Sequence, residues 1–148
     1  MPNASGNTGT DPTELEIEEP APPEPEVSED DLARHFVKES VSISLKYYLS
    51  SCECFSDWQP RDLKKFTGTI EKISGYDVDL LQRTKSLCDS HKGAPSYARF
   101  RRPDAISDDV LFYELKVDPS NKARIHGFFV KGVFFLVWLD RKHQCFEQ

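Results

Sequence analysis

The chain has 148 residues, a formal net charge of -6, 38% hydrophobic residues and four cysteines. This length fits a single domain. The longest apolar run, residues 127–139, is interrupted by Lys131 and is too short to cross a bilayer. The residues after Met1 lack the basic and apolar regions of a secretory signal. We therefore expect a cytoplasmic protein that has no membrane partner.

The negative charge is concentrated in residues 1–33. This segment holds ten acidic side chains, no Lys or Arg, and six of the ten prolines. Such a composition buries too little apolar surface to offset the chain entropy lost on folding, so it predicts a disordered acidic arm. Residues 34–148 contain fifteen acidic side chains against nineteen Lys and Arg, a charge of about +4. We expect these residues to form a single α+β domain.

The first half of this domain has both helical and strand patterns. Residues 30–39 fit one short helix, and residues 41–48 alternate apolar and polar side chains, as a half-buried strand does. In residues 60–75 apolar side chains recur at spacings of three and four, which predicts a helix with a proline in its first turn. Asp77 can cap a second helix that runs to about residue 88. The sequence therefore predicts a helical hairpin.

The second half begins with residues 89–109, where two prolines, a glycine and mixed charges without a period predict a long loop. Three strand-like runs follow, joined by the turns DPSNK and Lys131-Gly132, and they cover residues 111–117, 123–130 and 133–139. The expected fold class is α+β. It is a small antiparallel sheet with a helical hairpin on one face, in the order β-α-α-β-β-β, preceded by the disordered arm.

The four cysteines give little sign of a metal site. Cys52-x-Cys54 could begin one, but no CxxC pair and no His-x-x-x-His follows it. A domain this rich in aromatic residues does not need disulfides in the cytoplasm. We expect reduced thiols, no metal and no cofactor.

Three short stretches resemble parts of one toxin family. They are PRDLKKF at residues 60–66, LFYELKV at residues 111–117 and KARIHGFF at residues 122–129. With the order of elements, they resemble the RelE/ParE toxin superfamily, and within it the HigB-like branch, over about residues 40–146. The chain departs from the family pattern in two ways, because its last segment has no tyrosine to stack a base and its acidic arm lies outside the pattern.

The resemblance implies a curved antiparallel sheet with helices on one face. It also implies that the other face and its rim hold mRNA for cleavage, commonly on the ribosome, and that a separate antitoxin inhibits the protein. Members of the gyrase-inhibiting branch share the fold without this chemistry, so fold alone does not define the function.

The turn DPSNK sets a register for the first strand pair. If it closes a five-residue loop, Lys116 lies opposite Arg124 and Glu114 lies opposite His126. All four side chains then share one face, since side chains alternate along a strand.

The turn at Lys131-Gly132 extends this register to the last strand. It places His126 opposite Val137 and Arg124 opposite Leu139. Residues 140–143, which end in a histidine, then come to the same end of the sheet. The charged ends of the most apolar run are thereby predicted to meet at one place.

RNA cleavage through the 2′-OH needs a base, cations that hold the phosphate, and an acid for the leaving 5′-oxygen. Histidine suits both proton-transfer roles, because its ordinary pKa of roughly 6.5 lies near neutral pH. We expect the candidate catalytic residues to be Glu114, Arg124, His126 and His143. Glu114 or His143 would act as base, His126 or His143 as acid, and Arg124 and Lys116 as phosphate clamps.

A purely structural interpretation of the same residues stays open. Charged residues at strand ends are commonly a solvated edge. His126 is also expected as a core histidine bonded to a backbone carbonyl, and Glu114 as half of a cross-strand pair with His126 or Arg124.

Residues 97–102, YARFRR, interleave aromatic side chains with arginines, as single-stranded RNA-binding segments do. The alternative is a loop that docks its aromatic rings on the core and leaves its arginines in water. The RNA-binding candidates are Lys116, Lys142, Arg99, Arg101 and Arg102.

Two functions remain open from the sequence. The first is a toxin-like endoribonuclease that cleaves mRNA, with or without the ribosome, by metal-independent acid–base chemistry. The second is a non-catalytic module of the same fold that binds a protein, as gyrase-inhibiting toxins do.

Overall fold

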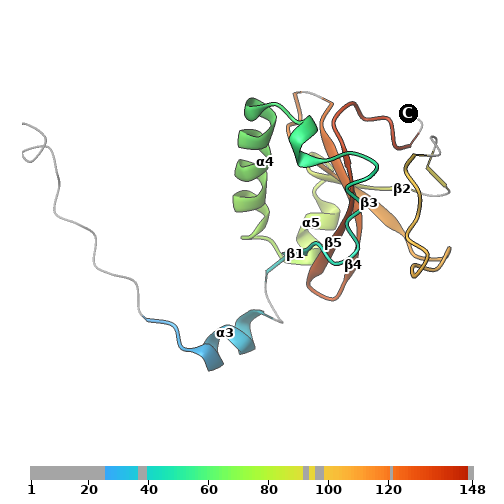
Figure 1. Ribbon diagram of the computed structural model, residues 1–148. Coiled ribbons are helices and arrows are strands. Elements are labelled where there is room, and N and C mark those ends of the chain that lie inside the picture. Colours follow the sequence, from blue (N-terminus) through green and yellow to red (C-terminus); the bar gives the residue numbers. More distant parts are fainter. Residues whose placement is uncertain (1–25, 37–39, 92–93, 96–98, 121, 147–148) are drawn as a thin grey trace, which may run out of the picture.

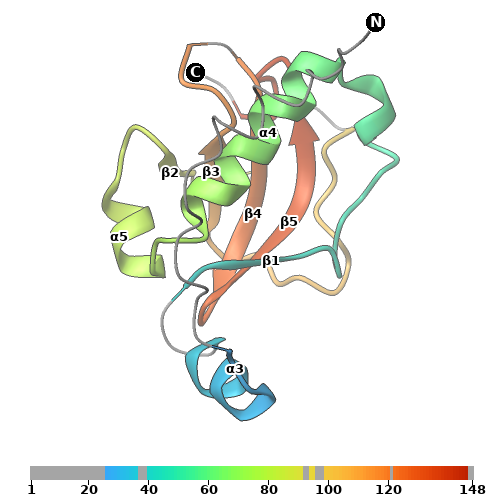
Figure 2. The same ribbon diagram turned by 90° about the vertical axis from the view of Figure 1, so that its left-hand side faces the viewer.

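The computed structural model describes residues 26–36, 40–91, 94–95, 99–120 and 122–146. It has mixed α+β architecture, in which helices α4 (Pro60–Ile73) and α5 (Val78–Arg83) pack on a five-stranded sheet (Figure 1). A further helix, α3 (Glu29–Phe36), stands apart from the sheet in both views (Figures 1 and 2). Within the described ranges, no helix is long and apolar enough to span a membrane. The α+β prediction is confirmed, whereas residues 1–25 of the acidic arm lie outside the described residues.

The sheet has the strand order β1-β5-β4-β3-β2. Its strands are β1 (Ser42–Ser44), β2 (Cys88–His91), β3 (Phe112–Lys116), β4 (Arg124–Val130) and β5 (Val133–Asp140). β1 runs parallel to β5 and the other neighbours are antiparallel, so the sheet is mixed and not wholly antiparallel as expected. Because both helices and three strands lie between β1 and β5 in the chain, this connection can return as a crossover.

Three elements differ from the sequence prediction. β1 covers only residues 42–44 of the strand expected over residues 41–48. β2 occupies residues 88–91, where a second helix was expected to end and a loop to begin. Only one of its four residues is apolar, so the strand exists through pairing with β3 and not through a local pattern. α5 is accordingly short. Asp77 caps it as predicted, but it ends at Arg83.

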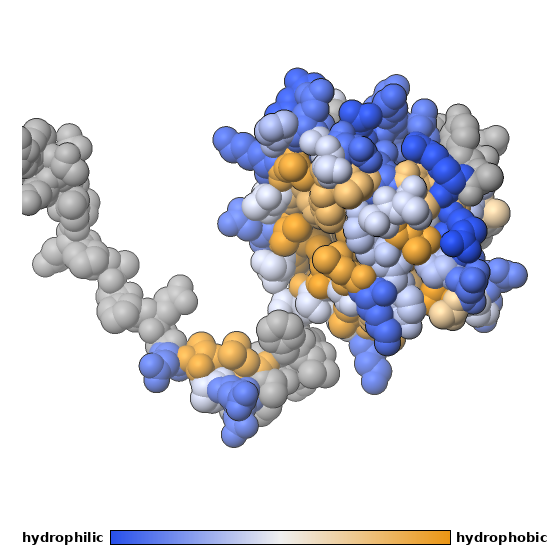
Figure 3. All heavy atoms as spheres, in the orientation of Figure 1, coloured by the Kyte–Doolittle hydropathy of each residue, from blue (hydrophilic) through white to orange (hydrophobic). Residues whose placement is uncertain are grey.

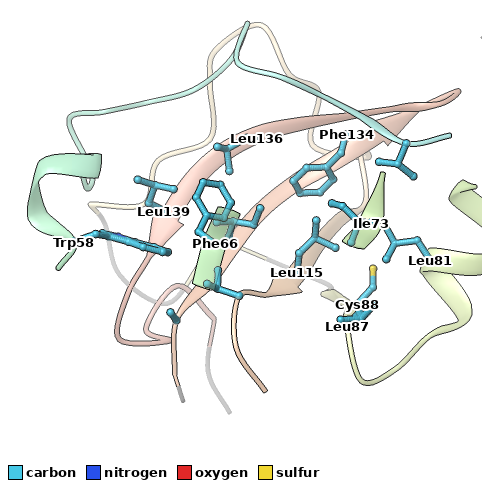
Figure 4. Packing of buried hydrophobic residues seen from close by; sticks show 14 residues of the cluster. Trp58, Phe66, Ile73, Leu81, Leu87, Cys88, Leu115, Phe134, Leu136 and Leu139 are labelled. Carbon is cyan, nitrogen blue, oxygen red and sulfur yellow. The ribbon is translucent and has the colours of Figure 1, made fainter. Parts of the chain in front are cut away.

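One core lies between the helices and the sheet. Phe66 and Ile73 of α4 point toward Leu115 and Phe134 of the sheet, and Leu81 of α5 closes one end (Figure 4). All five side chains are buried. The apolar spacing that predicted α4 thus positions the helix across the sheet.

A second core fills the opposite face of the sheet. It consists of Phe100, Phe112, Phe128, Val137, Trp138, Cys145 and Phe146. Phe100 comes from the loop before β3, and Cys145 and Phe146 come from the segment after β5. The face that the family resemblance leaves for RNA is therefore largely covered by the chain itself, and only its rim can serve as a site.

Buried Glu53 ties two distant segments together. Its Oε1 accepts hydrogen bonds from the Trp58 indole at 2.7 Å and from the Arg141 backbone N–H at 2.7 Å. The carboxylate thereby fixes the start of the segment that follows β5 against the segment before α4.

The outer surface of the domain is mostly hydrophilic. Seen as in Figure 1, hydrophilic residues form most of its outline, and apolar residues gather in the middle of the view (Figure 3). The exposed cations of α4 are Arg61, Lys64, Lys65 and Lys72. These residues form a solvated basic face, as the helical pattern indicates.

Candidate active site

The predicted register between β3 and β4 is confirmed. Glu114 pairs with His126 and Lys116 pairs with Arg124. Both pairs lie directly opposite each other in an antiparallel ladder, so Glu114 and His126 point to the same face of the sheet.

The register between β4 and β5 changes once. It follows the prediction from the turn as far as Gly127, and then Val137 is skipped, so that His126 pairs with Trp138. The predicted pairing of His126 with Val137 is thus wrong by one residue, because a β-bulge adds a residue that turn length cannot reveal. Gly127 permits the bulge, since a Cβ atom there would lie 2.0 Å from the Phe135 carbonyl oxygen.

The bulge decides which side chains of β5 reach the site. Beyond it, Arg124 pairs with Asp140 where the regular register predicted Leu139. Since side chains alternate along a strand, the shift turns Trp138 and Asp140 to the face that carries His126. Without the bulge, the Asp140 carboxylate would point into the core under the helices.

Glu114 is the centre of the site. Its Oε1 lies 2.6 Å from Nε2 of His91 and 3.0 Å from Nε2 of His143. Its Oε2 accepts a hydrogen bond from Nε of Arg124 at 3.3 Å. A single carboxylate from β3 therefore joins the last residue of β2, the first residue of β4 and the segment after β5.

This environment sets the charge of Glu114. Burial by itself would raise the pKa of the carboxyl group, but the hydrogen bond from His91 and the nearby His126 and His143 lower it to about 2. Glu114 is therefore a carboxylate at neutral pH. It orients its histidines and is a poor proton acceptor, so the structure favours His143 over Glu114 for the predicted role of base.

A second pair, His126 and Asp140, lies beside Glu114 with both side chains fully buried. Nε2 of His126 and Oδ2 of Asp140 are 2.8 Å apart. The backbone N–H groups of Gln144 and Cys145 also donate to Asp140, at 2.7 and 2.9 Å. Burial lowers the pKa of His126 although Asp140 opposes the shift, so the ring is neutral, with its hydrogen on Nε2 facing the carboxylate.

The segment after β5 closes over this end of the sheet. His143 has a φ of 57° and its backbone N–H donates to the Asp140 carbonyl at 3.4 Å, so the chain turns back sharply here. Phe146 then stacks on the His91 ring, with centroids 4.3 Å apart and planes 5° apart. The side chains of His91 and His143 remain 19% and 16% exposed, so both rings are accessible from the rim.

The structure brings the four predicted catalytic residues together, although not all at the rim. Glu114, Arg124, His126 and His143 are linked directly or through a shared partner. Arg124 and His126 are buried, and His126 has a carboxylate partner in place of the backbone carbonyl that the structural alternative expected. The cross-strand pair of Glu114 with Arg124 is present. Arg124 therefore holds Glu114 in place, and its expected role as a phosphate clamp stays a prediction.

The two predicted lysines are placed differently. Lys116 donates to the Lys85 carbonyl at 2.9 Å and lies 3.5 Å from the carboxylate of Asp89, the residue that pairs with Glu114 across β2 and β3. Lys142 lines an open pocket of about 220 Å³ with three other cations, Arg61, Lys122 and Arg141. This basic pocket also includes Ala123, the residue before Arg124.

The loop that carries Arg99, Arg101 and Arg102 docks on the second core through Phe100. Phe100 is buried and meets Trp138 edge to face, with centroids 6.2 Å apart. Arg101 reaches Asp104, and Arg102 donates to the Ser107 carbonyl. Arg99 donates to the Gln144 side chain at 2.9 Å. The docked-loop alternative is confirmed for Phe100, whereas Tyr97 lies outside the described residues.

Sequence reasoning missed His91 and treated Asp140 only as part of a charged run. His91 stands in a stretch with loop composition, and only pairing between β2 and β3 brings it to Glu114. The sequence did offer a chemical signal. The chain has only four histidines, and His91 is the one outside α3 that was not assigned to the site.

The cluster could also hold a metal ion. His91, Glu114 and His126 each offer one ligand atom, and these atoms lie within 4.8 Å of one another.

Comparisons with protein-family models, curated proteins and solved structures find no match to this chain.

Proposed function

We propose that residues 34–148 form a toxin-like endoribonuclease that cleaves mRNA in the cytoplasm. The observation that carries the proposal is that two accessible imidazoles, His91 and His143, meet one oxygen of Glu114. Transesterification of RNA needs one group that accepts the 2′-OH proton and one that protonates the leaving oxygen. Two neighbouring histidines can supply the proton acceptor and the proton donor while Glu114 stays ionised.

The roles follow from the contacts of each residue. Glu114 fixes the two rings by hydrogen bonding, and Arg124 holds Glu114 from its other oxygen. His143, at a sharp turn of the chain, would act as base, and His91 as acid. Arg124 is a positioning residue in this scheme. One ring accepts the proton of the 2′-OH and the other gives a proton to the leaving 5′-oxygen, so both rings are required.

Cations near the rim would hold the RNA backbone. Arg99 bonds to Gln144, the neighbour of His143, and the basic pocket with Lys142 begins beside Arg124. A phosphate chain that passes His143 can therefore be contacted by these cations. The resemblance to the RelE/ParE toxins adds a ribosome-bound mRNA as substrate and a separate antitoxin as partner.

The test is cleavage of RNA by the purified full-length protein, with and without ribosomes. His91→Gln and His143→Gln should each lower the rate by about 10²-fold or more, because each removes one proton-transfer group. His35→Gln, a matched change in α3, should leave the rate unchanged. Circular dichroism confirms that each variant is folded.

Two results would reject the proposal. If the parent protein cuts no RNA under either condition, the domain is a non-catalytic protein-binding module. If the parent cuts RNA and both histidine variants cut equally well, Glu114 and its histidines are a structural cluster and the active site lies elsewhere.

A further inference from the structure

We propose that His91, Glu114 and His126 form a binding site for a transition-metal ion such as Zn²⁺, with Asp140 orienting His126. The proposal concerns binding alone and does not require RNA cleavage. Two imidazole nitrogens and one carboxylate are a donor set that zinc accepts in three-ligand protein sites. Their ligand atoms come from β2, β3 and β4 and lie within 4.8 Å of one another.

The strongest observation is the state of His126. Its side chain is 0% exposed, and its Nε2 bonds to Asp140. This bond leaves the lone pair on Nδ1, which is buried and has no hydrogen-bond partner among the described residues. A buried acceptor without a donor costs free energy, and a bound metal ion would satisfy it.

Asp140 matches the usual support of a metal-binding histidine. Such histidines commonly give their second ring N–H to a carboxylate, which fixes the tautomer and makes the ligating nitrogen more basic. Asp140 does this for His126 and is itself anchored by two backbone N–H groups. The bulge in β5 exists at the position that brings this carboxylate to the ring. The ligand is thus oriented independently of the metal.

The three ligands need only a small adjustment. Around a tetrahedral zinc ion with bonds of roughly 2.0–2.1 Å, ligand atoms stand about 3.3 Å apart. His126 and Glu114 are fixed in the sheet, whereas His91 is the last residue of an edge strand and is partly exposed. A rotation of His91 can therefore bring its nitrogen from a hydrogen bond with Glu114 to a metal shared with it.

The fixed charges of the cluster favour a cation. Glu114 and Asp140 contribute two negative charges, and Arg124 contributes one positive charge. These three groups leave a net charge of -1 in a buried place. Two nitrogen donors favour zinc and similar ions over Mg²⁺, which prefers oxygen ligands.

Metal binding would also regulate the proposed function. The ion would occupy Glu114 and His91, which the proposed cleavage uses for orientation and proton transfer. Zinc should therefore inhibit RNA cleavage, and a chelator should restore it. This consequence rests on the proposed function, whereas the binding site does not.

The experiment is titration calorimetry of the full chain, stripped of metal, with ZnCl₂ and with MgCl₂. One zinc ion per chain should bind and magnesium should not. His91→Gln and Glu114→Gln should weaken zinc binding by at least ten-fold, and Asp140→Asn by about 10- to 100-fold. His35→Gln is the matched control and should bind zinc as the parent does. His91→Gln is the main variant, since its ring is partly exposed and its loss should leave the fold intact by circular dichroism.

Cobalt(II) as a spectroscopic probe separates this site from the cysteines. Nitrogen and oxygen ligands give visible d–d bands without the thiolate charge-transfer band that cysteine ligation produces. Absence of zinc binding, unchanged binding in both His91→Gln and Glu114→Gln, or a thiolate band would each overturn the proposal. A parent protein that binds zinc but cuts no RNA would reject only the proposed function.

Discussion

Replacing Gly127 by alanine tests whether the bulge between β4 and β5 is built as described. A Cβ atom at Gly127 would lie 2.0 Å from the carbonyl oxygen of Phe135 and 2.9 Å from a ring carbon of Phe134. Ordinary van der Waals contact begins at 3.4 Å, so the backbone of β5 would have to move by about 1.4 Å. β5 lies between β4 and β1 in the sheet and cannot move freely.

The expected cost follows from this clash. Adding atoms to a packed interior costs typically about 1–3 kcal/mol and occasionally more. The obstacle to Gly127→Ala is backbone and not a flexible side chain, so we expect about 3 kcal/mol or more. Domains of this size unfold with only about 5–15 kcal/mol in total. The midpoint of thermal unfolding should therefore fall by about 12 °C or more.

The assay is thermal unfolding followed by circular dichroism, with Gly68→Ala as the control. Gly68 lies inside α4, and a Cβ atom there would meet nothing within 4 Å. Alanine is the better helix former, so Gly68→Ala should stabilise the protein by about 0.5–1 kcal/mol. The same chemical change is thus expected to act with opposite sign at the two glycines. If Gly127→Ala unfolds within about 2 °C of the parent, the two strands are not as close as described, and the bulge argument is wrong.

Three further predictions address other parts of the chain. Burial raises the pKa of the Cys145 thiol, whereas hydrogen bonds from Ser56 lower the pKa of the partly exposed Cys54 thiol, so iodoacetamide should alkylate Cys54 at least about ten-fold faster in mass-spectrometric mapping; equal rates would contradict this. Glu53→Ala should cost about 2–4 kcal/mol in urea unfolding because it leaves one buried and one partly buried donor unpaired, and Glu53→Gln should cost less, since its amide oxygen still accepts. Deleting residues 1–33 should leave the unfolding midpoint within about 3 °C; a larger fall would show that the arm packs on the domain.

Most of the sheet could be predicted because its signals are local. The apolar runs and the turn at Lys131-Gly132 fix β4 and β5, and Lys131 has the positive φ of 56° that such turns need. The five-residue turn before β4 gives the Glu114–His126 pair correctly. Turn length therefore carries enough information to place two site residues opposite each other.

The remainder depends on contacts that no local pattern encodes. β2 is a strand only because β3 offers hydrogen bonds, so His91 could not be placed from its neighbours in sequence. The bulge at Val137 changes which face Asp140 occupies, and the close approach of the two strands at Gly127 that accompanies it has no signal in the turn length. The alternation in residues 41–48 predicted the strand β1, but only three of these residues pair, and their parallel pairing with the last strand of the chain has no local signal. Each miss involves pairing between distant segments.

Burying the polar cluster costs folding free energy, so its presence needs a reason other than stability. Glu114, Arg124, His126 and Asp140 are all buried beside the second core. Replacing buried ion pairs by well-packed apolar residues is often neutral or stabilising, so stability alone does not account for four such residues. The cluster reaches the surface at the rim, where His91 and His143 are partly exposed. A cluster that served only to hold the strands together would not need accessible rings at its edge, whereas a site that exchanges protons or binds a metal does. The exposure of these two histidines, set against the burial of their partners, is therefore the observation on which both proposals for this site rest.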